Sequence, residues 1–154
     1  MYLAQANIAR MKGPIDGPVM REFAEQLDTI NSLADRHPGF VWRLQTEAGD
    51  ATAIRVFEDE LILFNMSVWK SLEDLFDYTY RREHAGVFRD RGKWFNAMDV
   101  PTHVLWWIPG QHVPTTEEAK QKLALLEEHG PTSQAFTFKH RFDQEGRKLE
   151  KESK

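Results

Sequence analysis

Cysteine is absent from the 154-residue sequence. Without cysteine the chain forms no disulfide, no thiolate nucleophile and no zinc site of the cysteine type. The sequence also lacks an N-terminal signal pattern and any run of about 20 apolar residues that could span a membrane. The absence of cysteine fits a reducing compartment, and the other two absences favour a protein that is neither exported nor inserted in a membrane, so we expect a cytoplasmic protein without membrane partners.

A clear excess of one charge is missing as well. The chain has 20 Lys and Arg against 24 Asp and Glu, a formal net charge of -4, and the two signs are interspersed along it. Nucleic acid normally requires a clustered basic face, so we expect no nucleic-acid partner. The sequence contains no zinc-binding H-E-x-x-H, no G-x-S-x-G and no G-x-G-x-x-G, which argues against a zinc, serine-hydrolase or dinucleotide site. We predict no metal.

Aromatic residues, in contrast, are abundant. Ten Phe and five Trp in a chain that is 41% hydrophobic indicate a folded protein with a substantial core. We expect one domain over residues 1–142. Residues 143–154 alternate in charge without an apolar stripe, so we expect a disordered or frayed tail there.

The pattern of apolar residues predicts a mixed α+β fold. Alternating or β-rich stretches indicate strands, and apolar residues three or four apart indicate helices. The segment 52–60 could be a short strand or a loop. The expected elements are strands at 2–11, 40–45, 61–69, 102–108 and 135–138, and helices within 19–36, from Ser71 to about Phe88, and from Thr115 to Gly130. Capping patterns, Ser71 with Asp74 and Thr115 with Glu118, predict where the last two helices begin. This order predicts a ferredoxin-like split βαβ fold with an antiparallel sheet and its helices on one face.

Two adjacent tryptophans lie in the strand HVLWW. Because successive strand side chains point to opposite faces, Trp106 and Trp107 cannot enter the same core. One of them would face the side of the sheet that helices leave open, and a large apolar patch there is unfavourable in a monomer. We therefore expect a homodimer that closes this face around a partly polar pocket. The alternative is that C-terminal elements of the same chain cover it.

Several segments together resemble a known family. They are LAQANIARM, PGFVWRLQ, LILFNMSVW, YRREHAGVFRDRGKWF and HVLWWIPGQHVPT. In this order they resemble a bacterial family of uncharacterised domains in the dimeric α/β-barrel superfamily, over nearly the whole chain up to about Phe138. The resemblance implies a homodimer with a pocket inside each sheet. The superfamily contains antibiotic-biosynthesis monooxygenases, haem-degrading monooxygenases, haem-dependent peroxidases and simple ligand-binding proteins, so the fold does not determine the reaction.

Asn65 and Trp69 are four residues apart on one expected strand and point to the same face. Their spacing resembles the Asn-x-x-x-Trp arrangement of cofactor-free antibiotic-biosynthesis monooxygenases, in which an amide and an indole orient a phenolic substrate that itself activates oxygen. Our leading hypothesis is such an enzyme, acting on an aromatic or polyketide-like compound with these two residues as catalytic groups. The alternative is that Trp69 is an interface ring and Asn65 bonds a buried backbone group.

The rest of the expected site follows from the same hypothesis. Asn7 and Arg43 would stabilise developing oxyanion charge, and His84 or His103 would move a proton. Trp107 would line the pocket. A basic stretch near its mouth could attract a carboxylate or could be an ordinary solvated helix face; it comprises Arg81, Arg82, Arg89, Arg91 and Lys93.

Two further hypotheses remain open. Asn7, Trp69 and His84 are similar to the Asn, Trp and His set of haem-degrading monooxygenases, which would make His84 the haem ligand. The alternative for His84 is a core histidine within a stripe that includes Tyr80 and Phe88. No cofactor is predicted by the leading hypothesis, and haem is the alternative. The last hypothesis is a non-catalytic, dimeric ligand-binding protein.

Overall fold

The computed structural model describes residues 1–45, 56–81 and 91–150. In chain order the helices and strands are β1 (Tyr2–Met11), α1 (Arg21–Arg36), β2 (Phe40–Arg43), β3 (Ile62–Trp69), α2 (Leu72–Phe76), β4 (Phe95–Asn96), β5 (His103–Ile108) and α4 (Thr116–His129). A π-helical turn, Asp77–Arg81, continues α2, and a 3-10 turn, Arg91–Lys93, precedes β4. No described helix has the length and apolar character needed to cross a membrane.

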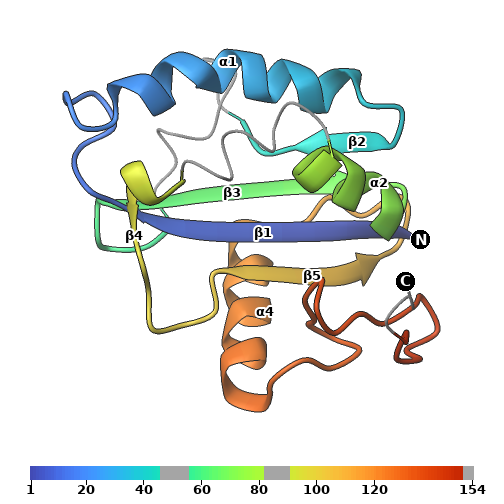
Figure 1. Cartoon of the computed structure of the whole chain (residues 1–154). Helices are drawn as coiled ribbons and strands as arrows, with labels where there is room; N and C mark the ends of the chain where they lie inside the picture. Colours follow the sequence, from blue (N-terminus) through green and yellow to red (C-terminus); the bar gives the residue numbers. More distant parts are fainter. Residues whose placement is uncertain (46–55, 82–90, 151–154) are drawn as a thin grey trace.

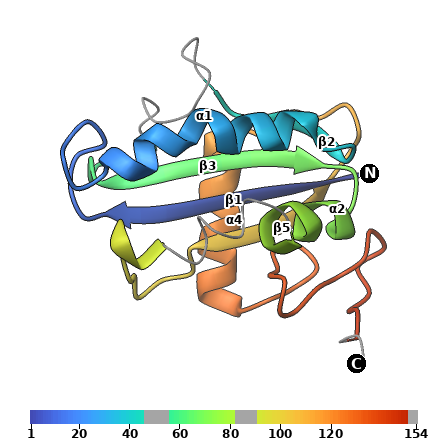
Figure 2. The same cartoon turned by 45° about the horizontal axis from the view of Figure 1, so that its top comes forward.

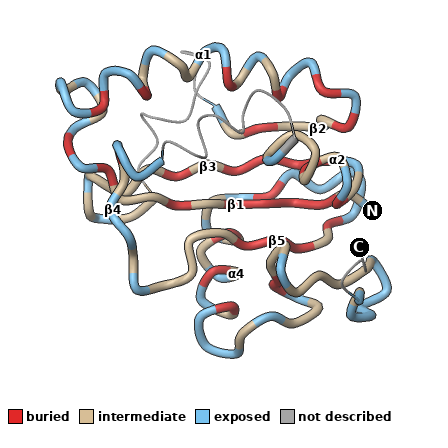
Figure 3. Tube along the Cα trace, viewed as in Figure 1, coloured by how far each residue is buried: buried red, intermediate tan, exposed pale blue. Residues whose placement is uncertain are grey.

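The strands form one antiparallel sheet with the order β2-β3-β1-β5. The short strand β4 pairs with the end of β1, beyond β5 on the same edge. With two helices crossing between the strands, this order confirms the predicted ferredoxin-like α+β fold (Figure 1). In Figure 3 the three long strands β1, β3 and β5 are mostly buried.

Helices cover both faces of the sheet, which corrects the expectation that they lie on one. Figures 1 and 2 show α1 and α2 on one side and α4 on the other. Even-numbered residues of the three long strands, such as Ala6, Met66 and Val104, pack with Leu123 of α4. Odd-numbered residues face α1 and α2. The error arose because strand periodicity separates two faces but does not say which helix covers each.

The two tryptophans are both satisfied within one chain. Trp106 is only 1% exposed, lies on the face covered by α4, and donates from Nε1 to Glu118 Oε2 at 2.8 Å. Trp107 points to the opposite face and donates from Nε1 to the carbonyl oxygen of Phe142 at 2.8 Å. The C-terminal segment therefore covers the second ring, which is the alternative that the sequence left open. An uncovered tryptophan no longer argues for a second subunit.

The C-terminal segment is more ordered than its charge pattern suggested. Leu105 of β5 pairs with Phe136 through an isolated bridge rather than the expected strand at 135–138. Further on, Phe142 pairs with Lys148, and Leu149 packs against the same buried cluster as Trp107. Residues 143–150 thus fold back onto the sheet, because their few apolar side chains anchor an otherwise charged stretch.

Two other expectations differ in part from the structure. Helix α2 is only five residues long, although Ser71 caps it as predicted by accepting from the backbone N–H of Asp74 at 3.1 Å. The continuation expected toward Phe88 falls in 82–90, outside the described residues. Of the segment 52–60, residues 56–60 form no strand, and the rest is not described.

Candidate ligand pocket

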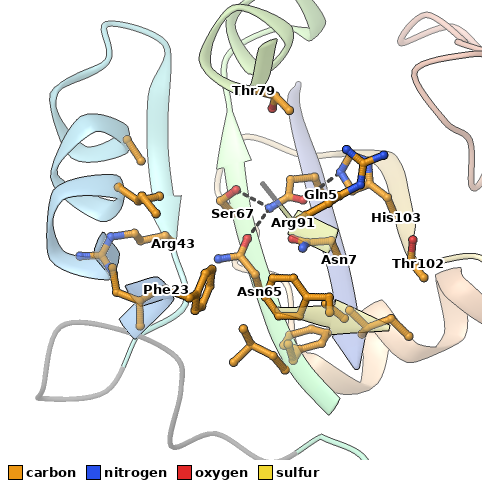
Figure 4. Close-up of a pocket in the computed structure, with 18 of the residues that line it drawn as sticks. Gln5, Asn7, Phe23, Arg43, Asn65, Ser67, Thr79, Arg91, Thr102 and His103 are labelled. Carbon is orange, nitrogen blue, oxygen red and sulfur yellow. Dashed lines mark hydrogen bonds between the residues drawn. The ribbon is translucent and has the colours of Figure 1, made fainter. Parts of the chain in front are cut away.

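A cavity of about 690 Å³ lies between the sheet and the helices α1 and α2. Its volume falls within the range of about 300–1,000 Å³ that is typical of small-molecule sites. Helix α1 contributes apolar walls through Phe23, Leu27 and Ile30, and Phe95 of β4 adds a further ring. Figure 4 shows labelled polar side chains from three strands gathered beneath these walls.

The floor of this cavity is polar because the strand pattern changes there. On this face the sheet is apolar at one end, where Leu3, Trp69 and Leu105 form a cluster, and again at the other end around Met11 and Trp94. Between the two clusters the same face carries five polar side chains, which we call the pocket floor: Gln5, Asn7, Asn65, Ser67 and His103. Polar residues at core-facing positions are unfavourable unless they are paired, so their pairing is informative.

Gln5 is the centre of the hydrogen-bond network on the floor. Its Nε2 donates to Asn65 Oδ1 at 2.9 Å and to Ser67 Oγ at 2.7 Å, which uses both amide hydrogens. Its Oε1 accepts from His103 Nε2 at 3.0 Å. Because an amide oxygen only accepts, the proton of the imidazole lies on Nε2, and Nδ1 keeps a free lone pair.

His103 is uncharged at neutral pH. Burial lowers the pKa of its imidazole to about 4, since no acidic partner offsets the loss of water. Among the described lining residues the charged side chains are Arg43 and Arg91. The hydrogen-bond donors and acceptors that the floor presents to the cavity are therefore neutral.

Trp69 borders the floor at its apolar end. Its ring is fully buried, and its Nε1 donates to Ser67 Oγ at 2.8 Å. His37 and Tyr78 pack against it, with ring centroids 5.4 Å and 4.9 Å away. The indole N–H is thus bonded to Ser67, and the substrate-orienting role expected for Trp69 stays a prediction.

A second set of contacts holds the π-helical turn against α1. His37 Nδ1 accepts from the backbone N–H of Gly39 at 3.0 Å, so its Nε2 carries the proton and donates to Asp77 Oδ2 at 2.9 Å. Tyr78 donates from its hydroxyl to the carbonyl oxygen of Ile30 at 3.1 Å, and burial raises the pKa of this phenol. These contacts position the wall of the cavity above Trp69.

Arg43 reaches the cavity from β2 but is tied to a carboxylate. It is buried, and its guanidinium donates to the two oxygens of Asp35 at 2.8 Å and 3.3 Å. Its charge is therefore balanced on the α1 side of the pocket, away from the imidazole of His103. Arg91 is exposed and lines the same cavity, as expected for part of the basic stretch.

The structure brings together five of the seven predicted site residues. Lining one cavity are Asn7, Arg43, Asn65, Trp69 and His103. Trp107 lies on the same sheet face but packs against the C-terminal segment instead. His84 lies outside the described residues. The sequence reasoning missed Gln5 and Ser67, although the pairs Gln5/Asn7 and Asn65/Ser67, each two residues apart, place polar groups on one face.

No cluster of three or more His, Cys, Asp or Glu side chains that could hold a metal ion occurs in the described part of the chain. Comparison with known proteins finds one family model, described as a domain of unknown function (DUF3291), which matches residues 2–152. No curated protein and no solved structure matches the chain. The expected kinship with an uncharacterised domain family is confirmed, and placement in the dimeric α/β-barrel superfamily stays a prediction.

Proposed function

The chain belongs to the DUF3291 family, and from its pocket we propose that it binds a small, uncharged aromatic molecule. The observation that carries this proposal is the neutral pocket floor beneath apolar and aromatic walls. A protein core gains nothing from polar side chains whose hydrogen-bonding groups stay unpaired. A ligand with an aromatic body and a polar edge would satisfy both the walls and the floor.

Filling the pocket tests this proposal. Ala9 of β1 lines the cavity, so Ala9→Phe should abolish the saturable binding of naphthol measured by isothermal titration calorimetry. Ala124 is exposed on α4, across the sheet from the pocket, and Ala124→Phe is the matched control that should bind like the wild type. Equal binding by both variants, or no binding of aromatic probes by the wild type, would refute the proposal.

A cofactor-free monooxygenase is the second candidate, favoured by the fact that Asn65 and Trp69 line the same cavity. The site chemistry supports binding more strongly. Moving a proton from a phenol of pKa about 10 to an imidazole of pKa about 4 is unfavourable by about 8 kcal/mol. An oxygen electrode distinguishes the two: naphthol-dependent oxygen uptake that disappears in Asn65→Ala would establish the enzyme.

The haem-binding alternative places the iron ligand at His84, outside the described residues. The described residues do not fit haem, because the Trp69 ring is fully buried with its N–H on Ser67 and offers no free face to a macrocycle. Titration of haem into the purified protein should leave the Soret band of free haem unshifted, and a saturable shift that is lost in His84→Ala would reverse this conclusion.

The homodimer is also a proposal. Both tryptophans are covered within one chain and the pocket is lined by residues of that chain, so a partner is not required to build either. Light scattering measures the mass of the wild type and of Ala9→Phe. The first mass shows whether a dimer forms, and the second shows whether the dimer persists when the pocket is filled. We place the protein in the cytoplasm on the basis of its cysteine-free sequence.

A further inference from the structure

The side-chain amide of Asn7 is the one group of the pocket floor that the Gln5 network does not include. Asn7 lines the cavity at the middle of β1, and Figure 4 shows it between the labelled Asn65 and His103. Its amide has no hydrogen-bond partner among the residues that the structure describes. Both its donor and its acceptor are therefore available to a ligand.

Asn7 is the centre of a row of polar side chains that crosses three strands. Its Cα pairs with that of Asn65 on β3 and with that of His103 on β5. With strands about 4.8 Å apart, the row spans about 10 Å, enough for a two-ring molecule. Asn65 keeps its Nδ2 donors, and His103 keeps its Nδ1 acceptor. The row thus offers a donor, then a donor and acceptor together, then an acceptor.

We propose that Asn7 recognises the edge of a planar nitrogen heterocycle in which an N–H donor lies next to a carbonyl acceptor, as in a lactam. A side-chain amide presents its oxygen and its NH₂ side by side, and so forms two parallel hydrogen bonds with such an edge, as Asn and Gln do with adenine. This inference rests on the proposed function, because it names the chemical class of the ligand for the same pocket.

The surroundings of Asn7 favour a neutral, flat ligand. The floor carries no charge at neutral pH, and Arg43 is bonded to Asp35 at the side of the cavity. Asn7 carries no charge, and the charged side chains among the described lining residues, Arg43 and Arg91, are both cationic, so a positively charged ligand edge would lose water without gaining a counter-charge. Phe23 and Phe95 form an edge-to-face pair in the wall, with centroids 5.1 Å apart, and provide ring surface for a planar ligand.

Three probes that differ only at the edge test the proposal on the wild-type chain. Carbostyril carries the lactam edge, N-methylcarbostyril lacks its N–H donor, and naphthalene lacks the edge altogether. We expect carbostyril to bind about tenfold or more tightly than either of the other two, because a site built for a hydrogen bond rejects an analogue without it. Isothermal titration calorimetry and saturation-transfer NMR measure the affinities.

The variants assign this preference to Asn7. Asn7→Leu keeps the side-chain volume and should bind all three probes with similar affinity. Asn96→Leu is the control, since Asn96 is exposed at the cavity rim on β4 and lies outside the row; it should keep the wild-type preference. If Asn7→Leu does not fold, the wild-type comparison of carbostyril with its N-methyl derivative still decides whether the pocket recognises the lactam N–H.

The outcomes separate this inference from the proposed function. Equal wild-type binding of the three probes would refute recognition of a lactam edge and would leave the proposed binding of an aromatic molecule unaffected. A preference that persists in Asn7→Leu would overturn the assignment to Asn7. No saturable binding of any probe would overturn both proposals.

Discussion

His103 shows at the residue scale how burial on the pocket floor makes the stability of the protein depend on pH. Its imidazole lies on the floor with its proton on Nε2, held by Gln5, and burial lowers its pKa to about 4 from an unfolded value of about 6.5. Between these two pH values the unfolded chain binds a proton that the folded chain does not. The free energy of unfolding is therefore highest above pH 6.5, where both states have a neutral His103, and it falls as the pH drops toward 4, because protonation stabilises the unfolded chain.

We expect the free energy of unfolding of the wild type to fall by about 2 kcal/mol more than that of His103→Gln between pH 7 and pH 5. Glutamine can still donate to Gln5 but does not titrate, so the substitution removes only the contribution of His103 protonation to the free energy of unfolding. Urea unfolding at the two pH values measures the difference. Other histidines and the carboxylates contribute equally to both proteins. Parallel pH profiles for the two proteins would contradict the prediction.

The site residues show what single positions reveal in a sequence and what they do not. Asn65 and Trp69 were correctly placed on one face by their spacing, since strand periodicity is a local property. The role of Trp69 could not be read in this way, because Ser67 takes its N–H and His37 covers its ring only after distant segments pack together. Gln5 was missed because its partners lie on two other strands.

At the element scale, the turn His37-Pro38-Gly39 holds β2 against the start of α2. The backbone oxygen of Gly39 accepts from the N–H of Lys70 at 2.8 Å, and its N–H donates to the His37 ring. A Cβ at residue 39 would approach the Cβ and carboxylate of Asp74, in the first turn of α2, more closely than carbon atoms do in real proteins. The glycine is required for this close approach.

Gly39→Ala should therefore lower the free energy of unfolding by about 1–3 kcal/mol, the usual cost of forcing extra atoms into a packed site. The control is Gly92→Ala, where an added Cβ meets nothing within 4 Å and the stability should stay the same or rise slightly. Urea denaturation of both variants measures the effect. Equal midpoints for Gly39→Ala and Gly92→Ala would show that the turn can relax at no cost.

The elements themselves were largely predictable, for reasons that differ between them. Helix α4 begins at Thr115, whose Oγ1 accepts from the N–H of Glu118 at 3.1 Å, as the capping pattern predicted. Its position could not be predicted, because the carboxylate of Glu118 bonds Trp106 and so fixes α4 to the face of the sheet opposite α1 and α2. Local signals predict where a helix starts, and side chains far away in sequence determine where it packs.

For the whole molecule, elements of one chain lie on both faces of its sheet. Helix α4 covers one face, and on the other face α1, α2 and the C-terminal segment share the surface. The C-terminal segment follows the other elements in the sequence, yet it packs against Leu105 and Trp107 in the middle of the chain's last long strand. Charge pattern alone indicated a loose tail, since the contribution of Phe142 and Leu149 depends on a surface that the rest of the fold creates.

Removing residues 141–154 tests this closure. The truncated chain loses the hydrogen bond from Trp107 to Phe142 and the packing of Phe142 and Leu149, so its free energy of unfolding should fall by about 3 kcal/mol. Tryptophan emission should shift to longer wavelength as Trp107 meets water. Removing only 151–154 is the matched control and should change neither quantity. If both truncations behave like the full chain, the segment does not cover Trp107 in solution, and a second subunit regains its place as the cover for that face.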